Sequence, residues 1–185
     1  MKSFTKLYIP IALETLCYML AGMVDTIMLS TVGDSAVGAV GTANTYINVF
    51  IIMFHVVSSG MIAVMTQYIG AKRIGVAFQA RQLGAVFNMV LGVALSIFLF
   101  VFSGLILEIV GVAPLLMDYA KTYLKIVGGF CFLNALIPIF SSYLRAFGYT
   151  KQPLIATLVA NVVNLCLNAV FLFGLHAGVA GVAVA

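Results

Sequence analysis

The sequence predicts an all-α integral membrane protein built as a polytopic helical bundle. Of its 185 residues, 64% are hydrophobic and only 8% are charged, which is more apolar surface than one compact core can hide. The apolar residues are also grouped into stretches of about 20, the length that a helix needs to cross a hydrocarbon layer about 30 Å thick. We therefore expect residues 1–185 to form one transmembrane unit.

The expected spans follow one another along the chain, and each is bounded by polar or charged residues. Five stretches are apolar at nearly every position: 7–29, 46–69, 83–107, 123–144 and 154–173. A sixth apolar stretch begins near Gly178, and the sequence stops inside it at Ala185. Because no polar flank follows, we expect the sixth helix to be truncated and the sequence to be part of a longer protein.

The basic residues predict the orientation of the spans. Seven of them fall on one side of the membrane, namely Lys2, Lys6, Lys72, Arg73, Arg81, Arg145 and Lys151, and two, Lys121 and Lys125, fall on the other. Since Lys and Arg in short loops stay on the cytoplasmic side, the N-terminus is predicted to be cytoplasmic. The net charge of +4 has the same origin, so it does not indicate a nucleic-acid partner.

Acidic residues inside the first span are the strongest functional signal. Asp25 lies in a stretch that otherwise faces lipid, and a carboxylate there costs about 3 kcal/mol or more to insert, so it normally faces a cavity or a protein interior. Glu14 lies 11 residues earlier on the same helical face, and Tyr18 falls close to that face. Asp25 is the candidate ion or substrate site. For Glu14, which lies nearer the cytoplasmic end, a functional and a structural role both remain open.

The fifth span carries three carboxamides on one helical face. Asn161, Asn164 and Asn168 are spaced i, i+3 and i+7, which suits either hydrogen bonding between membrane helices or oxygen ligands for a cation. Asp25 lies about 27 Å along the first span and Asn168 about 21 Å along the fifth, both running outward. Both therefore belong to the outer half of the bilayer, where they could meet.

His55 lies near the middle of the second span, between Phe54 and Val56. A titratable imidazole at this depth could relay protons. A neutral histidine bonded to a backbone or hydroxyl group fits the sequence at least as well, so both readings stay open.

Three segments resemble the multidrug and toxic compound extrusion (MATE) transporters. They are PIALETLCYMLAGMVDTIMLSTVGDSAVGAVG at 10–41, the basic segment QYIGAKRIGVAFQAR at 67–81, and LRAFGYTKQPLIATLVANVVNLCLNAVFLFG with GVAGVAVA at 144–185. The first has the early proline, the Val-Asp-Thr and the Gly/Ala-rich loop of the family. Together they span almost the whole sequence, and the third is the most specific.

The resemblance implies a fold of two six-helix lobes around a central cavity that opens to alternate sides. This sequence would be the first lobe, and its partner would be the C-terminal lobe of the same transporter. In the family the acid at the position of Asp25 takes part in cation coupling, together with a polar pair that falls on Asn164 and Asn168. Some members carry an acid at the position of Asn168, so this sequence has one titratable group fewer at that site than they have.

The resemblance thus implies a secondary active exporter of amphipathic or cationic drugs and toxic compounds. It would lie in the plasma (inner) membrane and be coupled to Na⁺ or H⁺, with no cofactor and no resident metal. A lipid-linked oligosaccharide flippase of the same superfamily is the alternative, although its cavity would be expected to carry several basic residues. An intramembrane aspartic protease is excluded, since Glu14 and Asp25 lie about 16 Å apart along one helix.

Overall fold

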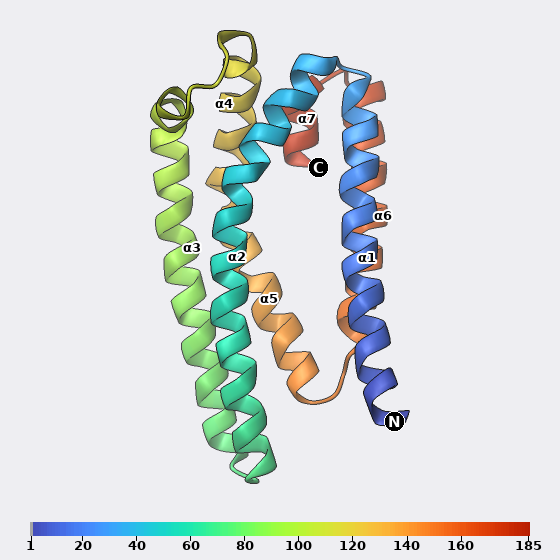
Figure 1. The fold of residues 1–185 in the computed structure, drawn as a ribbon, viewed down its shortest axis with the longest axis vertical. Helices are drawn as coiled ribbons and strands as arrows, with labels where there is room; N and C mark the ends of the chain where they lie inside the picture. The colour runs from blue at the N-terminus through green and yellow to red at the C-terminus, as the bar shows by residue number, and fades with distance from the viewer. Residues whose placement is uncertain (1) are drawn as a thin grey trace.

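The protein is helical over nearly its whole length, and the computed structural model describes residues 2–185 (Figure 1). The side chains of Lys2 and Lys6, which the charge count includes, and that of Leu7, where the first span was expected to begin, lie outside the described residues. The helices are α1 (Lys2–Ser30), α2 (Asp34–Gly70), α3 (Ile74–Val110), α4 (Pro114–Gly129), α5 (Cys131–Ala146), α6 (Lys151–Ala169) and α7 (Gly178–Val184), with a π-helical segment η1 (Val170–Gly174) after α6. The all-α fold class is confirmed.

Helix α2 begins 12 residues before the expected span, which corrects the interpretation of the Gly/Ala-rich segment as a loop. Ala36, Ala39, Val40 and Ala43 are all buried, and their spacing places them on one helical face. This face packs into the main core. The small side chains that looked like loop residues therefore allow close helix packing, and the connection from α1 shrinks to residues 31–33.

Helix α3 likewise begins before its expected span, at Ile74, so the basic loop between the second and third spans shrinks to residues 71–73. Arg81 lies within α3, with its guanidinium carbon 4.9 Å from the ring centroid of Tyr143 on α5. Both α2 and α3 are 37 residues long, about 55 Å at 1.5 Å per residue, which is longer than the hydrocarbon layer requires. Apolarity predicts only the part of each helix that lies in lipid.

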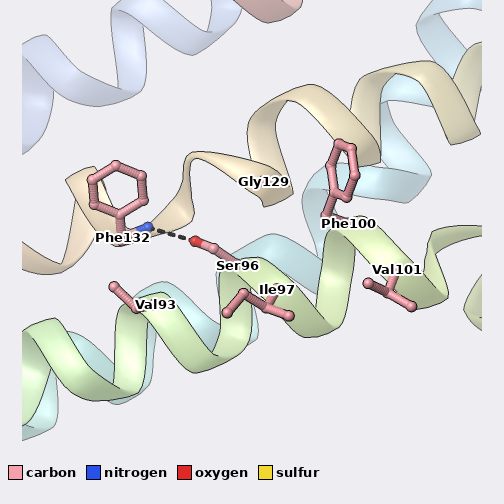
Figure 2. A pocket seen from close by; sticks show the side chains of 7 residues that line it. All are labelled: Val93, Ser96, Ile97, Phe100, Val101, Gly129 and Phe132. Atoms are coloured by element: carbon pink, nitrogen blue, oxygen red, sulfur yellow. Dashed lines mark hydrogen bonds between the residues drawn. The ribbon is translucent and has the colours of Figure 1, made fainter.

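The fourth span, expected as one helix over 123–144, is broken. Helices α4 and α5 meet at Phe130 with a bend of 48°. A Cβ added to Gly128 would lie 2.9 Å from the Cβ of Leu99, so α4 approaches α3 too closely for a larger residue just before the break. Just after it, the N–H of Phe132 donates to Ser96 Oγ at 2.9 Å (Figure 2). That hydrogen bond satisfies one of the amide groups that the break removes from the helix.

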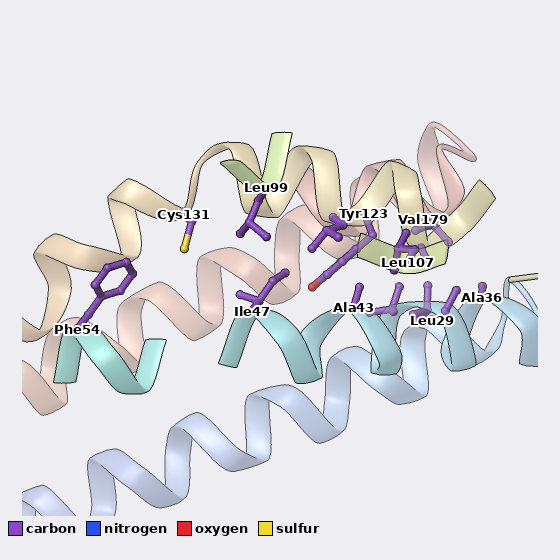
Figure 3. Packing of buried hydrophobic residues seen from close by; sticks show 14 of the residues in the cluster. Leu29, Ala36, Ala43, Ile47, Phe54, Leu99, Leu107, Tyr123, Cys131 and Val179 are labelled. Carbon is purple, nitrogen blue, oxygen red and sulfur yellow. The ribbon is translucent and has the colours of Figure 1, made fainter. Parts of the chain in front are cut away.

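Two groups of helices make up the molecule. Helices α2 to α5 pack closely together, and their buried residues, joined by Leu29 of α1 and Val179 of α7, form the main core (Figure 3). Helix α1 lies alongside α6 and packs chiefly against it. Among the described side chains, α1 buries only Pro10 and Leu29, and α6 buries only Pro153 and Asn168. The α1–α6 pair is therefore a separate unit beside the bundle.

The connections lie at the two ends of the molecule as the order of spans requires. The N-terminus, the 71–73 turn and the 147–150 turn lie at one end, the lower end of Figure 1. The turns at 31–33 and 111–113 and the segment before α7 lie at the other. Gly148, at φ +84°, adopts the left-handed conformation that lets α5 end and the chain reverse into α6. The basic loop residues are thus gathered at the end that carries the N-terminus.

Candidate cation site

Asp25 of α1 and two carboxamides of α6 form one connected polar group. Asn168 Nδ2 donates to Asp25 Oδ1 at 2.8 Å and to Asn164 Oδ1 at 3.3 Å. Asp25 and Asn168, whose depth in the bilayer allowed them to meet, are therefore in direct contact. Asn164 joins them because it lies one helical turn before Asn168 on the same face of α6.

Burial distinguishes Asn168 from every other polar residue of α6. It is 0% exposed, although α6 buries only one other residue. Its Oδ1 has no hydrogen-bond partner among the described residues. A buried carbonyl oxygen without a partner carries an unmet desolvation cost, so this oxygen has unused acceptor capacity.

Asp25 accepts a hydrogen bond from Asn168 but has no opposite charge beside it among the described residues. The one ion pair in the described part of the chain joins Glu14 to Arg145 and does not involve Asp25. The described residues also contain no group of three or more His, Cys, Asp or Glu side chains that could hold a multivalent metal. The arrangement of one carboxylate with neutral oxygens suits a proton or a single monovalent cation.

A hollow of about 240 Å³ gives access to this group between α1 and α6. Asp25, Asn161 and Asn164 supply its polar part, and apolar side chains of both helices, including Leu20, Val24 and Leu158, supply the rest. This polar group is therefore not sealed by the two helices that form it.

Asn161 lies on the expected face of α6 but binds elsewhere. Its Nδ2 donates to the backbone carbonyl of Cys17 at 3.0 Å, about two turns along α1 from Asp25. This hydrogen bond joins α6 to α1 nearer the N-terminus of α1 than Asp25. It corresponds to the packing role that the sequence left open for the carboxamides.

Tyr18 is a largely exposed residue of α1, with 64% of its side chain accessible. It lies on the side of α1 where Tyr123 of α4 interacts electrostatically with both Asp25 and Tyr18. Tyr123 in turn donates its hydroxyl to Asn44 Oδ1 of α2 at 3.0 Å. Asn44 and Tyr123 were not predicted as site residues. In the sequence, Tyr123 is merely the first residue of the expected span 123–144, and Asn44 lies two residues before the expected span 46–69.

Glu14 forms an ion pair with Arg145, and it is the one ion pair among the described residues. Arg145 Nη2 lies 2.7 Å from Glu14 Oε2. Sequence reasoning counted Arg145 as a loop charge, but it lies in the last turn of α5. His55 of α2 is exposed and close enough to interact electrostatically with both members of the pair. These residues form a second polar group, separate from that of Asp25.

Comparison with known proteins agrees with this architecture. The MatE family model matches residues 10–170. YisQ of Bacillus subtilis, described as an uncharacterized transporter, is 36% identical over 178 residues, which cover 94% of this chain and 39% of YisQ. The probable multidrug resistance protein NorM of Thermotoga maritima is 30% identical over 200 residues, which cover all of this chain and 40% of NorM.

Solved structures of low sequence identity share the fold. A MOP superfamily transporter from Pyrococcus furiosus superimposes with a TM-score of 0.90 at 21% identity, covering 99% of this chain and 40% of that one. An outward-facing multidrug resistance MATE family transporter gives the same score and identity, with 99% and 41% covered. The chain therefore spans about two fifths of the length of the proteins that it matches.

The evidence for the family is thus a family model that covers most of the chain, two relatives at 30% identity or more, and a shared multi-pass helical fold. The resemblance noted in the sequence is confirmed. The chain belongs to the MatE family, whose members are membrane transporters and not enzymes.

Proposed function

We propose that this chain is the N-terminal lobe of a secondary active exporter, in which a Na⁺ ion or a proton binds at Asp25, Asn164 and Asn168 and drives the export of amphipathic or cationic compounds. The observation that carries the proposal is the hydrogen-bonded group of one intramembrane carboxylate and two carboxamides, with a buried amide oxygen left free.

Charge neutralisation explains why a cation would bind there. An unpaired carboxylate in a membrane span is costly, and one monovalent cation or one proton makes the site neutral. Na⁺ favours oxygen ligands, and Asp25, Asn164 and Asn168 each supply one. In the present arrangement the amide nitrogen of Asn168 points at Asp25. Binding of Na⁺ would require this amide to turn its free oxygen toward the carboxylate, whereas a proton on Asp25 would not.

Binding of the ion can drive transport only if it favours one arrangement of the lobe over another. Asp25 lies on α1 and its partners lie on α6, so the ion would tie together the two helices of the α1–α6 pair. We propose that the C-terminal lobe of the same transporter completes the cavity, since alternating access needs two bundles that move about a site between them. The proposed location is the plasma (inner) membrane, with the N-terminus in the cytoplasm.

The basic residues favour a drug exporter over a lipid-linked oligosaccharide flippase. A flippase cavity would need free positive charge for an anionic headgroup. Arg145 is the basic side chain that lies beside α1, and Glu14 neutralises it. The relative NorM of Thermotoga maritima is described as a probable multidrug resistance protein, which supports the same choice.

The test is replacement of Asp25 in the complete transporter. Asp25→Asn should abolish gradient-driven efflux of a cationic dye such as ethidium while the protein still inserts into the membrane, because the amide cannot bind a proton or charge-balance Na⁺. Asp118→Asn is the matched control, since Asp118 is an exposed acid in the second turn of α4, and it should keep wild-type efflux. Wild-type efflux by Asp25→Asn at every Na⁺ concentration and pH would refute the site. Dye efflux absent from the wild type, together with transbilayer movement of a lipid-linked sugar, would favour the flippase.

A further inference from the structure

A second polar group lies on α1, about 16 Å along the helix from Asp25, and the proposed cation site makes no use of it. We propose that Glu14 and Arg145 form a latch that closes the opening between the α1–α6 pair and the α2–α5 bundle at the end of the lobe that carries the N-terminus. This inference rests on the proposed function, because a latch has a role only in a lobe that changes shape.

The ion pair is a side-chain tie between two units that are otherwise joined at this end by the 147–150 turn and by a few contacts of α5 with α6. Glu14 belongs to α1 and Arg145 to α5, and the two charged groups are 2.7 Å apart. Helix α1 packs chiefly against α6, with smaller contacts to α2 and α7. Figure 1 shows α1 and α2 joined at the 31–33 turn and diverging toward the N-terminal end, and it shows α7 near the turn. The smaller contacts therefore lie at the far end from the latch.

The pair occupies a position where neither charge would be stable alone. The side chains of Glu14 and Arg145 are only 14% and 26% exposed, and Arg145 Nε is buried with no hydrogen-bond partner among the described residues. Separating the charges would leave two partly buried groups uncompensated, one of them, Glu14, inside the first apolar span. The pair can open only when water reaches both groups, so its opening and the entry of water at this end would occur together.

The surroundings of the pair place it at an entrance. His55 on α2 is exposed and close enough to interact electrostatically with both charges, so a second bundle helix also comes near the pair. Tyr18 lies one turn beyond Glu14 and is exposed on the side of α1 that faces Tyr123. A reagent that enters from the N-terminal end would therefore pass the latch before it reached position 18. The reactivity of position 18 reports whether the latch is closed.

The latch is tested by the rate at which a thiol at position 18 reacts. Tyr18→Cys is introduced into the complete transporter with Cys17, Cys131 and Cys166 replaced by Ala, and inside-out vesicles without any ion gradient are treated with an impermeant maleimide. Glu14→Gln and Arg145→Gln should each increase the labelling rate about tenfold, the usual size of a conformational coupling. The exchanged pair, Glu14→Arg with Arg145→Glu, should return the rate toward that of the parent. A position of the exposed 71–73 turn, Lys72→Cys, should label at one rate in all backgrounds.

Two results would overturn the latch. One is an unchanged labelling rate at position 18 in both glutamine variants, and the other is a labelling rate in the exchanged pair that is as high as in the single variants. If the single variants fail to insert, Glu14→Cys with Arg145→Cys joined by a short thiol crosslinker provides the second measurement. With Tyr18 kept, so that the crosslinker meets no other thiol, closing the pair should stop efflux by the complete transporter, and efflux that continues with the pair crosslinked would overturn the latch. Labelling needs neither gradient nor substrate, so failure of Asp25→Asn to affect efflux would refute the cation site without touching this result.

Discussion

Asn88 shows how one neutral side chain can hold an apolar bundle together. It lies on α3 with no exposed surface, and its Nδ2 lies within hydrogen-bond distance of three acceptors on two other helices. These are Phe54 O at 3.2 Å, Ser58 Oγ at 3.3 Å and Ala135 O at 3.1 Å. Because Phe54 and Ser58 belong to α2 and Ala135 to α5, one amide joins three helices where the apolar effect alone would not fix their register.

Replacing Asn88 by Ala should destabilise the lobe. The change removes the hydrogen bonds by which the amide joins α3 to α2 and α5, at a cost of about 1–3 kcal/mol. Asn48→Ala on the exposed side of α2 is the matched control and should have no such effect, since Ala is a better helix former than Asn. Thermal unfolding of the purified full-length protein in detergent measures both variants. Equal melting temperatures for Asn88→Ala and the wild type would contradict this role.

At the scale of the helices, small residues determine how closely neighbours approach. Gly92 of α3 is buried against α5, and a Cβ added there would lie 2.9 Å from the Cβ of Ala135 and 3.0 Å from the Cα of Phe132. The second contact is with backbone, which cannot move aside as a side chain can. The close approach of α3 and α5 beside the break at Phe130 therefore depends on the absence of a side chain at position 92.

Adding one methyl group at this contact should separate the two helices. Gly92→Ala should destabilise the protein by about 1–3 kcal/mol, the usual cost of overpacking a tight contact. Gly60→Ala on α2 is the control, because a Cβ there would meet nothing within 4 Å, and it should be neutral or stabilising by up to about 1 kcal/mol. Melting temperatures in detergent distinguish the two. A Gly92→Ala protein as stable as Gly60→Ala would show that α3 can move away from α5 without cost.

For the whole molecule, the sequence predicted best those features that depend on composition and on short spacing. The helical fold class followed from the apolar content, and the depth of Asp25 and Asn168 along their helices left their contact possible without requiring it. The partner of Glu14 could not be predicted, because Arg145 lies 131 positions away and meets it only through tertiary packing. The helical character of residues 34–45 was missed for a related reason, since small residues resemble a loop until the surface that they pack against is known.

The proposed cation site and the proposed latch lie toward opposite ends of the α1–α6 pair. The orientation in the membrane therefore decides which of them lies nearer the cytoplasm. If the end that carries the basic loops is cytoplasmic, the cation site at Asp25 belongs to the outer half of the lobe and the Glu14–Arg145 latch to the inner half. An ion entering from outside would then reach its site with the latch closed. The reverse orientation would place the ion site at the cytoplasmic end. An ion driven inward from outside would then have to pass the latch before it reached the site.

Single cysteines in intact cells test this orientation. Thr31 and Arg73 are both exposed in short turns at opposite ends of the molecule, so a thiol at either position should react wherever a reagent can reach it. In a full-length protein without its native thiols, Thr31→Cys should react with an impermeant maleimide added outside the cells, and Arg73→Cys should react only after the membrane is permeabilised. This follows from the excess of Lys and Arg at the end that carries the N-terminus. Labelling of Arg73→Cys in intact cells, with Thr31→Cys protected, would reverse the orientation and place the latch, not the cation site, on the outer side.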